Sequence, residues 1–202
     1  MVVKICGITN REDALAAIHG GAAALGFNFY PASPRYIPPD EAAAIAAGLP
    51  AEVWKVGVFV DESPEAVLRT AAQVGLDIAQ LHGSESPEQY PAGIRVWRAV
   101  RVGPAFRLPT AGPEEAVLLD GPASGQVFDW THVGQAILPA GALSSAPKLI
   151  LAGGLDAANV REAIEQVHPW GVDACSRIES SPGRKDRLKM AAFLKAALAA
   201  SR

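Results

Sequence analysis

The sequence has few cysteines, few aromatic residues, no excess of positive charge and no long apolar segment. Two cysteines in 202 residues are too few for a disulfide framework, so a reducing cytoplasm is the expected location. The net charge of −3 argues against nucleic acid as a partner, because binding a phosphate backbone needs clustered Lys and Arg. Apolar stretches such as 191–200 fall short of the ~20 residues that cross a bilayer, so no membrane partner is expected. Residues 2–6 lack the features of a secretory signal.

What the sequence does contain is an alternation of short Val- and Ile-rich runs with Ala-rich amphipathic segments. Its 202 residues suit a single domain, 1–202, and are near the lower limit for an eight-unit α/β barrel. Eight runs are expected to be strands, with the spacing of about 20 to 25 residues that strand-plus-helix units of a parallel sheet require. They are 2–6, 23–27, 53–60, 78–81, 96–100, 116–120, 148–152 and 171–175.

Several of these runs are followed by helix-start signals, in which a side-chain oxygen accepts a hydrogen bond from a free backbone N–H group. The segment 103–115, between the fifth and sixth strands, holds three prolines, so a loop is expected to replace the helix there. The expected capping residues are Thr9, Ser63, Ser86 and Asp156.

The pattern predicts the α/β class and a single (β/α)8 TIM barrel. The alternative is a doubly wound open sheet. It is disfavoured because no G-x-G-x-x-G motif follows the first strand, and because polar residues end many strands rather than one switch point. Active sites of barrels gather at the carboxyl ends of the strands, so the chemistry is expected there.

The first strand ends in Lys4-Ile5-Cys6, and strand alternation puts Lys4 and Cys6 on one face. If that face is the barrel interior, the Lys4 ammonium could favour the Cys6 thiolate. Lys4 could equally pair with a buried carboxylate, and a Cys among Val and Ile can be an inert core residue.

Three further strand ends carry candidate site residues. Arg35 lies in a loop stiffened by prolines, where a preorganised guanidinium suits bidentate recognition of a carboxylate, although a lone loop Arg is often only solvated. Gln80 and His82 share a face at the end of the fourth strand, and an imidazole can donate or accept a proton near pH 7. Asp120 ends an apolar strand and is either a solvated cap or a catalytic acid.

The last two strands carry a phosphate signal. Gly153 and Gly154 follow the seventh strand, and glycines let backbone N–H groups approach an anion, although a Gly pair can also be a tight turn. Ser176 follows the eighth strand, and the loops after these two strands form the recurrent phosphate site of barrels. Zinc bound by Cys6, His82 and Cys175 would match no metal spacing, so no metal is expected.

These segments, in their joint order, resemble the phosphoribosylanthranilate isomerase family over essentially the whole chain. The resemblance is carried by Lys4-Ile5-Cys6-Gly7-Ile8-Thr9, Ser33-Pro34-Arg35-Tyr36, Gln80-Leu81-His82-Gly83, Leu151-Ala152-Gly153-Gly154-Leu155, and by 26–27, 119–120, 128–130, 171–173, 179–183 and 185–186. It implies an Amadori rearrangement of N-(5-phosphoribosyl)anthranilate to 1-(2-carboxyphenylamino)-1-deoxyribulose 5-phosphate in tryptophan biosynthesis, with no cofactor. The partner is then a small phosphorylated sugar, and the protein a monomer or homodimer.

The resemblance also implies roles for individual residues. Asp120 would be the general acid that opens the ribose ring, and Cys6 the general base that takes the C2 proton. Arg35 would hold the anthranilate carboxylate. The other substrate-binding residues would be Gly153, Gly154 and Ser176 around the phosphate, together with His82 and Asp173.

The chain departs from the family in the turn after the eighth strand, which usually reads Ser-Ser-Gly and here reads Cys175-Ser176-Arg177. Arg177 would either strengthen phosphate binding or point to solvent. Cys6 and Cys175 end neighbouring strands of a closed barrel, so oxidation could join them unless stagger keeps the sulfurs apart. Two other functions remain as alternatives, the barrel isomerase of histidine biosynthesis, which has an aspartate where Cys6 stands, and a non-catalytic relic.

Overall fold

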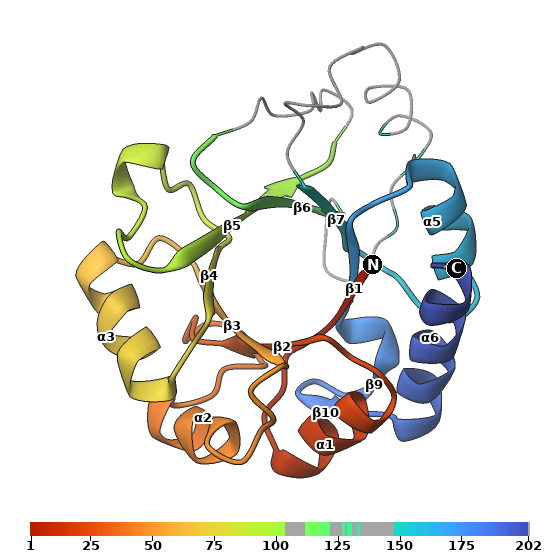
Figure 1. Cartoon of the computed structure of the whole chain (residues 1–202), viewed down its shortest axis with the longest axis horizontal. Helices are drawn as coiled ribbons and strands as arrows, with labels where there is room; N and C mark the ends of the chain where they lie inside the picture. The colour runs from red at the N-terminus through yellow and green to blue at the C-terminus, as the bar shows by residue number, and fades with distance from the viewer. Residues whose placement is uncertain (104–111, 122–126, 128, 131–132, 134–147, 202) are drawn as a thin grey trace.

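A closed barrel of eight parallel strands forms the centre of the molecule, and helices surround it (Figure 1). The computed structural model describes residues 1–103, 112–121, 127, 129–130, 133 and 148–201. The strands are β1 Val2–Cys6, β2 Ala24–Asn28, β3 Trp54–Phe59, β4 Ile78–Leu81, β5 Arg95–Arg101, β6 Ala116–Asp120, β7 Lys148–Leu151 and β8 Gly171–Ala174. All eight predicted strands are confirmed, and β1 pairs with β8 to close the ring.

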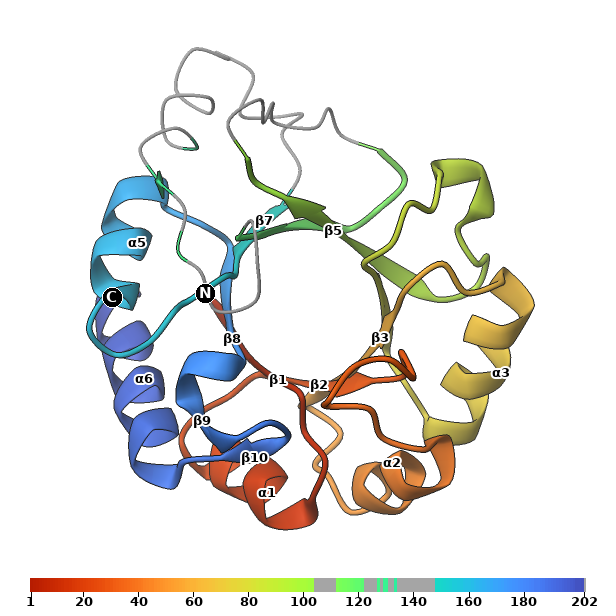
Figure 2. The same ribbon diagram turned by 180° about the vertical axis from the view of Figure 1, so that it is seen from behind.

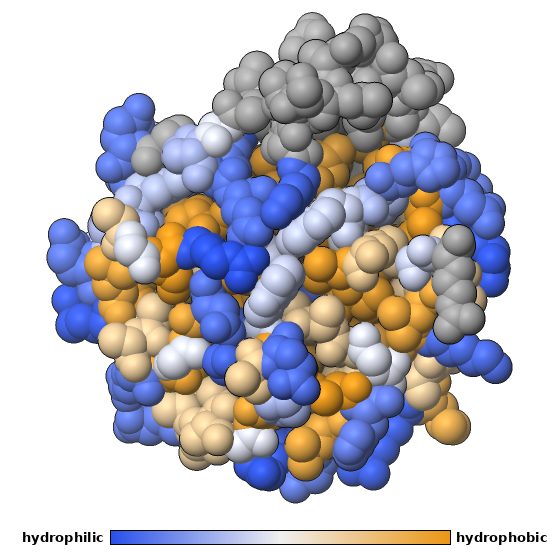
Figure 3. Space-filling model, viewed as in Figure 1, coloured by the Kyte–Doolittle hydropathy of each residue, from blue (hydrophilic) through white to orange (hydrophobic). Residues whose placement is uncertain are grey.

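The helices pack around the outside of the ring, as both views along the barrel show (Figures 1 and 2). Hydrophilic side chains cover much of the outer rim in Figure 3, as expected for helices whose apolar stripe faces the strands. The α-helices are α1 Arg11–His19, α2 Pro39–Ala46, α3 Pro64–Val74, α5 Val160–Val167 and α6 Arg187–Ala200. Shorter elements are the 3-10 helices η1 Pro87–Gln89 and η2 Ser176–Ile178, and the hairpin β9 Glu179–Ser181 with β10 Arg184–Lys185.

Two of the four predicted helix caps are wrong in position. Asn10, not Thr9, caps α1, because Asn10 Oδ1 accepts a hydrogen bond from Asp13 N at 2.9 Å. Thr9 instead donates its hydroxyl to the carbonyl oxygen of Gly183, which ties the first loop to the β9–β10 hairpin. Asp156 accepts from Ala158 N at 2.9 Å and so forms a local turn, but α5 begins only at Val160.

The other two capping signals give different outcomes. Ser63 caps α3 as predicted, and its hydroxyl accepts from Ala66 N at 3.3 Å. Ser86 begins only a three-residue 3-10 helix, in which Ser86 N donates to Gln89 Oε1 at 2.8 Å. The predicted loop at 103–115 is not tested, because residues 104–111 lie outside the described residues.

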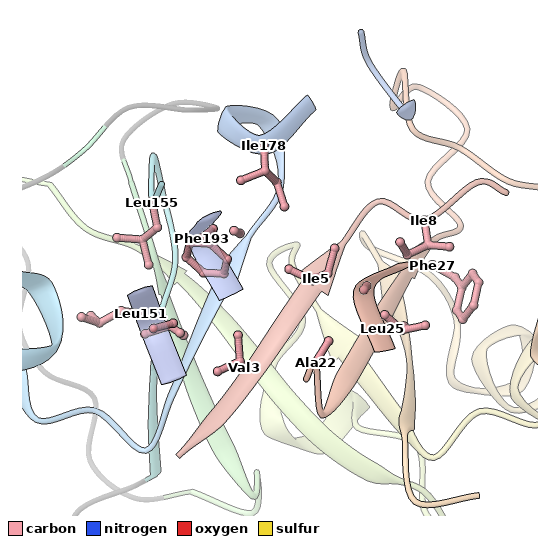
Figure 4. Packing of buried hydrophobic residues seen from close by; sticks show 14 of the residues in the cluster. Val3, Ile5, Ile8, Ala22, Leu25, Phe27, Leu151, Leu155, Ile178 and Phe193 are labelled. Atoms are coloured by element: carbon pink, nitrogen blue, oxygen red, sulfur yellow. The ribbon is translucent and has the colours of Figure 1, made fainter. Parts of the chain in front are cut away.

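Alternate residues of each strand face two separate apolar clusters. The outer cluster packs the strands on the helices, and Figure 4 shows Val3 and Ile5 of β1 in it with Phe193 of α6. The inner cluster fills the barrel and includes Val2, Ala24, Val56, Ile78, Trp97, Leu118 and Ile150. Because side chains alternate, Lys4 and Cys6 share the inner face with Val2, as the sequence predicts.

Three tryptophans close the amino-terminal end of the barrel, and we call Trp54, Trp97 and Trp170 the tryptophan floor. Their ring centroids lie 5.9 to 6.2 Å apart. Arg95 stacks on Trp54 at 4.4 Å, and Lys148 lies 4.7 Å from the Trp170 ring. Both cations also bind Glu115, at 2.7 and 3.0 Å. The hydrogen bonds from Arg95 are the main cause that lowers the pKa of Glu115 to about 2.

Candidate active site

A cavity of about 400 Å³ opens at the carboxyl ends of the strands. It brings together side chains from both halves of the chain, as expected for a barrel whose loops meet at one end. All of the site residues predicted from the sequence line it, namely Cys6, Arg35, His82, Asp120, Gly153, Gly154, Asp173 and Ser176. The remaining polar lining comes from Asn28, Gln80, Arg101, Cys175 and Arg177.

Lys4 contacts both groups that the sequence left as alternatives. Its Nζ donates to Asp173 Oδ1 at 3.0 Å, and both residues are buried. Lys4 Nζ and Cys6 Sγ also share the space above Gly26, where a Cβ atom would lie 3.1 and 2.8 Å from them. Lys4 therefore pairs with a buried carboxylate and lies beside the Cys6 sulfur at the same time.

Burial and the neighbouring charges set the protonation of this group. Burial lowers the pKa of Lys4, but the charges of Asp173 and Cys6 outweigh it, and the net pKa lies above the usual value. Burial also raises the pKa of Asp173 to about 7, against the pull of Lys4. Lys4 is therefore a cation at any physiological pH, while Asp173 titrates near neutrality.

The two cysteine sulfurs differ in protonation. Interaction with the Cys175 side chain lowers the pKa of Cys6 well below its usual value, which burial opposes and the charges of Lys4 and Lys185 support. The same interaction, together with burial, raises the pKa of Cys175. Both sulfurs are free in this structure, and whether oxidation joins them stays a prediction. The lowered pKa favours the thiolate of Cys6, which is the nucleophilic and basic form of cysteine.

Asp120 and His82 form a second polar pair in the cavity. His82 Nε2 lies 3.3 Å from Asp120 Oδ2, and both side chains are about a quarter exposed, at 23% and 24%. Asp120 Oδ1 accepts from Gly121 N at 2.9 Å. Because β7 and β8 separate β6 from β1 around the ring, Asp120 and Cys6 reach the cavity from different sides. A carboxyl group and a thiolate can therefore act on different atoms of one bound molecule.

Arg35 already has a carboxylate partner within the chain, which the sequence reasoning missed. Its Nε donates to Glu179 Oε1 and Oε2 at 2.9 and 3.1 Å, and its Nη2 donates to Oε2 at 2.7 Å. Lys185 Nζ donates to the same carboxylate at 2.9 Å. These bonds fix the guanidinium at the wall of the cavity, and Nη1 keeps no hydrogen bond to the described residues.

The glycine turn after β7 has left-handed backbone at both positions, with φ of +78° at Gly153 and +67° at Gly154. A Cβ atom on Gly153 would lie 2.3 Å from Gly121 N, so only glycine fits. The turn does not open α5 directly, because five residues separate Gly154 from Val160. The turn lines the cavity together with Ser176, the first residue of η2.

Arg177 does not simply point to solvent. Its Nη1 lies 3.7 Å from Asp156 Oδ2, and its side chain is 47% exposed. Arg177 therefore links η2 to the loop after β7 at the rim of the cavity, and its charge is shared with a carboxylate.

Several lining residues lie outside the predicted set. Gln80 is buried, and its Oε1 has no hydrogen-bond partner among the described residues. Asn28 and Arg101 end β2 and β5 and line the cavity. Alternation already placed Gln80 beside His82 in the sequence, and the same counting on the other two strands would have found Asn28 and Arg101, because each lies on the inner face of its strand.

The residues that the structure describes include neither a metal-binding cluster nor a membrane-spanning helix. There, no group of three His, Cys, Asp or Glu side chains is arranged to hold a metal ion. Likewise, none of the helices in the described ranges is long and apolar enough to cross a membrane.

Comparison with known proteins gives one consistent family. The family model described as N-(5'-phosphoribosyl)anthranilate (PRA) isomerase matches residues 3–196. A curated relative from Solibacter usitatus (strain Ellin6076), named N-(5'-phosphoribosyl)anthranilate isomerase, is 51% identical over 208 residues, which cover 99% of this chain and 98% of the relative.

Solved structures agree with this family. The chain is similar to phosphoribosyl anthranilate isomerase from Thermus thermophilus, with a TM-score of 0.89 and 39% identity over the whole of both chains. It is also similar to a phosphoribosyl anthranilate isomerase solved in complex with reduced 1-(o-carboxyphenylamino)-1-deoxyribulose 5-phosphate. That likeness has a TM-score of 0.83 and 41% identity, and covers 98% of this chain and 100% of the other.

Proposed function

The chain belongs to the N-(5'-phosphoribosyl)anthranilate isomerase family and performs this isomerisation in tryptophan biosynthesis, and we propose that Cys6 and Asp120 are its proton-transfer residues. The reaction converts an aldosylamine into an aminoketose by acid and base catalysis. It needs one group that gives a proton and one that takes a proton at another atom of the sugar. The single observation that carries the assignment is that the Cys6 sulfur and the Asp120 carboxyl group line one cavity from different strands.

Asp120 begins the reaction by giving a proton to the ribose ring oxygen. The C1–O bond breaks, and the nitrogen lone pair forms a C1=N double bond. The His82 imidazole, 3.3 Å from Asp120 Oδ2, can hydrogen-bond the carboxylate that this step leaves. The contact with His82 supports the role of Asp120 as the general acid. A general acid held in position contributes a factor of about 10² to 10⁴ in rate.

Cys6 then takes the proton from C2, and the electron pair of the C2–H bond moves toward C1=N to give an enaminol. The enaminol becomes the aminoketone when its oxygen loses a proton and C1 gains one, so the isomerisation balances without an added oxidant or reductant. The buried cations Lys4 and Lys185 support this role, because they favour the thiolate that must be present before C2 is deprotonated.

Substrate binding in this proposal uses the rest of the cavity. Arg35 holds the anthranilate carboxylate, which its unbonded Nη1 can reach while Glu179 keeps the guanidinium in place. Gly153, Gly154 and Ser176 hold the phosphate with backbone N–H groups and a hydroxyl, and His82 and Asp173 contact the ribose.

The remaining features of the proposal concern the protein as a whole. The closed ring from β1 to β8 supports one catalytic domain over 1–202. The substrate is a small phosphorylated sugar, the protein is a monomer or homodimer, and its location is the cytoplasm. The two free cysteines are consistent with a reducing compartment.

Loss of the fluorescence of freshly made phosphoribosylanthranilate tests the assignment. Purified protein is expected to remove the signal, and the double variant Cys6→Ala/Asp120→Asn is expected to remove it no faster than buffer. Circular dichroism of the double variant checks that the barrel is folded. A folded double variant that retained the wild-type rate would overturn the assignment of both residues.

A further inference from the structure

Cys175 lies beside Cys6 and takes no part in the proposed proton transfers. In the β1–β8 register, Ile5 pairs with Ala174, so the next residue along each strand is Cys6 and Cys175 respectively. Both residues line the cavity. A second thiol next to the proposed base is therefore a built feature of the site.

The Cys175 sulfur is held in place on several sides. Lys185 Nζ lies 3.9 Å from Cys175 Sγ and donates to the Cys175 carbonyl oxygen at 3.3 Å. A Cβ atom on Gly7 would lie 3.1 Å from Cys175 Sγ, so the glycine lets the β1 loop pass close to the sulfur. Glu179 Oε1 lies 3.9 Å from it on the hairpin side. The thiol has little room to turn away from Cys6.

The thiol has one proton and two possible acceptors, Glu179 Oε1 and the Cys6 sulfur. Glu179 Oε1 already accepts from Arg35 Nε and Lys185 Nζ, each at 2.9 Å, and from Gly183 N at 3.3 Å. A carboxylate oxygen with three donors gains little from a weak fourth donor at 3.9 Å. The Cys6 sulfur is the other acceptor, and the Lys4 ammonium beside it favours its negative charge.

We propose that Cys175 is a positioning residue whose thiol donates a hydrogen bond to the Cys6 sulfur and keeps Cys6 as the thiolate. This inference rests on the proposed role of Cys6 as the base. Lys4 supports the same thiolate from within β1, and Lys185 supports the pair from β10. The two cysteines thus form an asymmetric dyad with one thiolate and one thiol.

The opposite shifts of the two cysteines support the proposal. The pKa of Cys6 is lowered and that of Cys175 is raised, and the interaction between the two side chains is the largest cause of each shift. No other pair of thiols is available, because the chain has two cysteines. The charged groups around the dyad are Lys4, Asp173, Arg35, Glu179 and Lys185, with Asp120 across the cavity.

Alkylation of Cys6 by iodoacetamide, followed by peptide mass spectrometry from pH 4 to 10, tests the proposal. In the wild type we expect Cys6 to be alkylated in preference to Cys175. Cys175→Ala removes the donor, so we expect the alkylation midpoint of Cys6 to rise by about one pH unit, with about tenfold slower alkylation below the midpoint. Cys175→Ser keeps a donor and is expected to restore the wild-type midpoint to within a few tenths of a unit.

Cys175→Val is the second variant without a donor, and it fills the volume of the thiol if Ala proves unstable. A Cys6 midpoint equal to the wild-type value in both Ala and Val variants would overturn the proposal. Equal shifts in Ser and Ala would also overturn it, because volume rather than the donor would then set the protonation. So would preferential alkylation of Cys175.

This readout separates the dyad from the proposed function. Alkylation measures the free protein and needs no turnover, so it decides the role of Cys175 even if Cys6→Ala proves fully active. If Cys6 is the base, the acidic limb of the kcat/KM profile is expected to move upward in Cys175→Ala by the same amount as the alkylation midpoint. An unmoved limb with a shifted alkylation midpoint would sink the role of Cys6 and leave the dyad standing.

Discussion

The two ends of the barrel contain similar residue types and use them differently. At the amino-terminal end, Arg95 and Lys148 lie on the tryptophan floor and share Glu115. These ions remain partly exposed, so water offsets much of their charge. At the carboxyl end, Lys4 and Lys185 are fully buried beside carboxylates and thiols. Burial and close pairing there shift protonation states, and the difference separates a stabilising end from a reactive end.

The largest expected effect lies at the carboxyl end. Cys6→Ala and Asp120→Asn are each expected to lower kcat by about 10² to 10⁴ with KM nearly unchanged, because each removes a positioned proton-transfer group. Steady-state kinetics by the fluorescence assay measures both constants. The thermal midpoint is expected to change little, since neither side chain belongs to the apolar clusters. Near-full kcat in either variant would contradict the assignment of catalysis to these residues at the carboxyl end of the barrel.

The corresponding change at the amino-terminal end removes one ring of the tryptophan floor. Trp97 is fully buried inside the barrel, so Trp97→Ala is expected to destabilise the fold by about 3 to 5 kcal/mol. In a chain of this length that lowers the thermal midpoint by about 6 to 20 °C. Calorimetry measures the midpoint, and kcat at 20 °C is expected to stay within a few-fold of wild type. A loss of kcat as large as that of Cys6→Ala, in a protein still folded, would contradict the comparison.

Arg35→Ala separates two roles at the carboxyl end, substrate binding and proton transfer. A charge-assisted hydrogen bond to a carboxylate contributes about 1.5 to 3 kcal/mol, so KM is expected to rise about 10- to 150-fold. The change in kcat is expected to be small, because the anthranilate carboxylate persists through the reaction. Arg95→Ala is the matched control, an arginine that also binds a carboxylate but at the other end. An unchanged KM in Arg35→Ala would rule out its role as the carboxylate clamp.

The smallest expected effect concerns acid stability at the floor. The pKa of Glu115 is about 2 in the fold against an ordinary value of 4.5, so the unfolded chain binds its proton first. Glu115 therefore stabilises the fold above pH 4.5, and this contribution disappears as the pH falls toward 2. Glu115→Gln is expected to cost about 1 kcal/mol or less at pH 7 and nothing at pH 2. Urea unfolding at both pH values measures this, and an equal cost at both would contradict it.

The sequence predicts the strands well and the contacts around the site poorly, for physical reasons. Each strand is a short apolar run between more polar or Ala-rich segments, so its ends fall within one residue of the prediction. The Thr9 cap was misplaced because Asn10, one residue later, is an equally good cap. The Arg35–Glu179 pair joins residues 144 positions apart, and no local pattern encodes such a contact. By contrast, the sequence does predict that Cys6 and Cys175 end neighbouring strands, and the β1–β8 register puts each of them one residue beyond the paired Ile5 and Ala174.

The glycine at 153 has a consequence for how this protein can change during evolution. A Cβ atom at this position would lie 2.3 Å from Gly121 N and 3.2 Å from Asp120 Oδ1, so only glycine leaves room for them. A substitution at 153 would therefore push on the loop that carries Asp120, so the glycine turn and the proposed acid cannot change independently. A library that explores new phosphorylated substrates should hold positions 121 and 153 constant and vary the rim at 177.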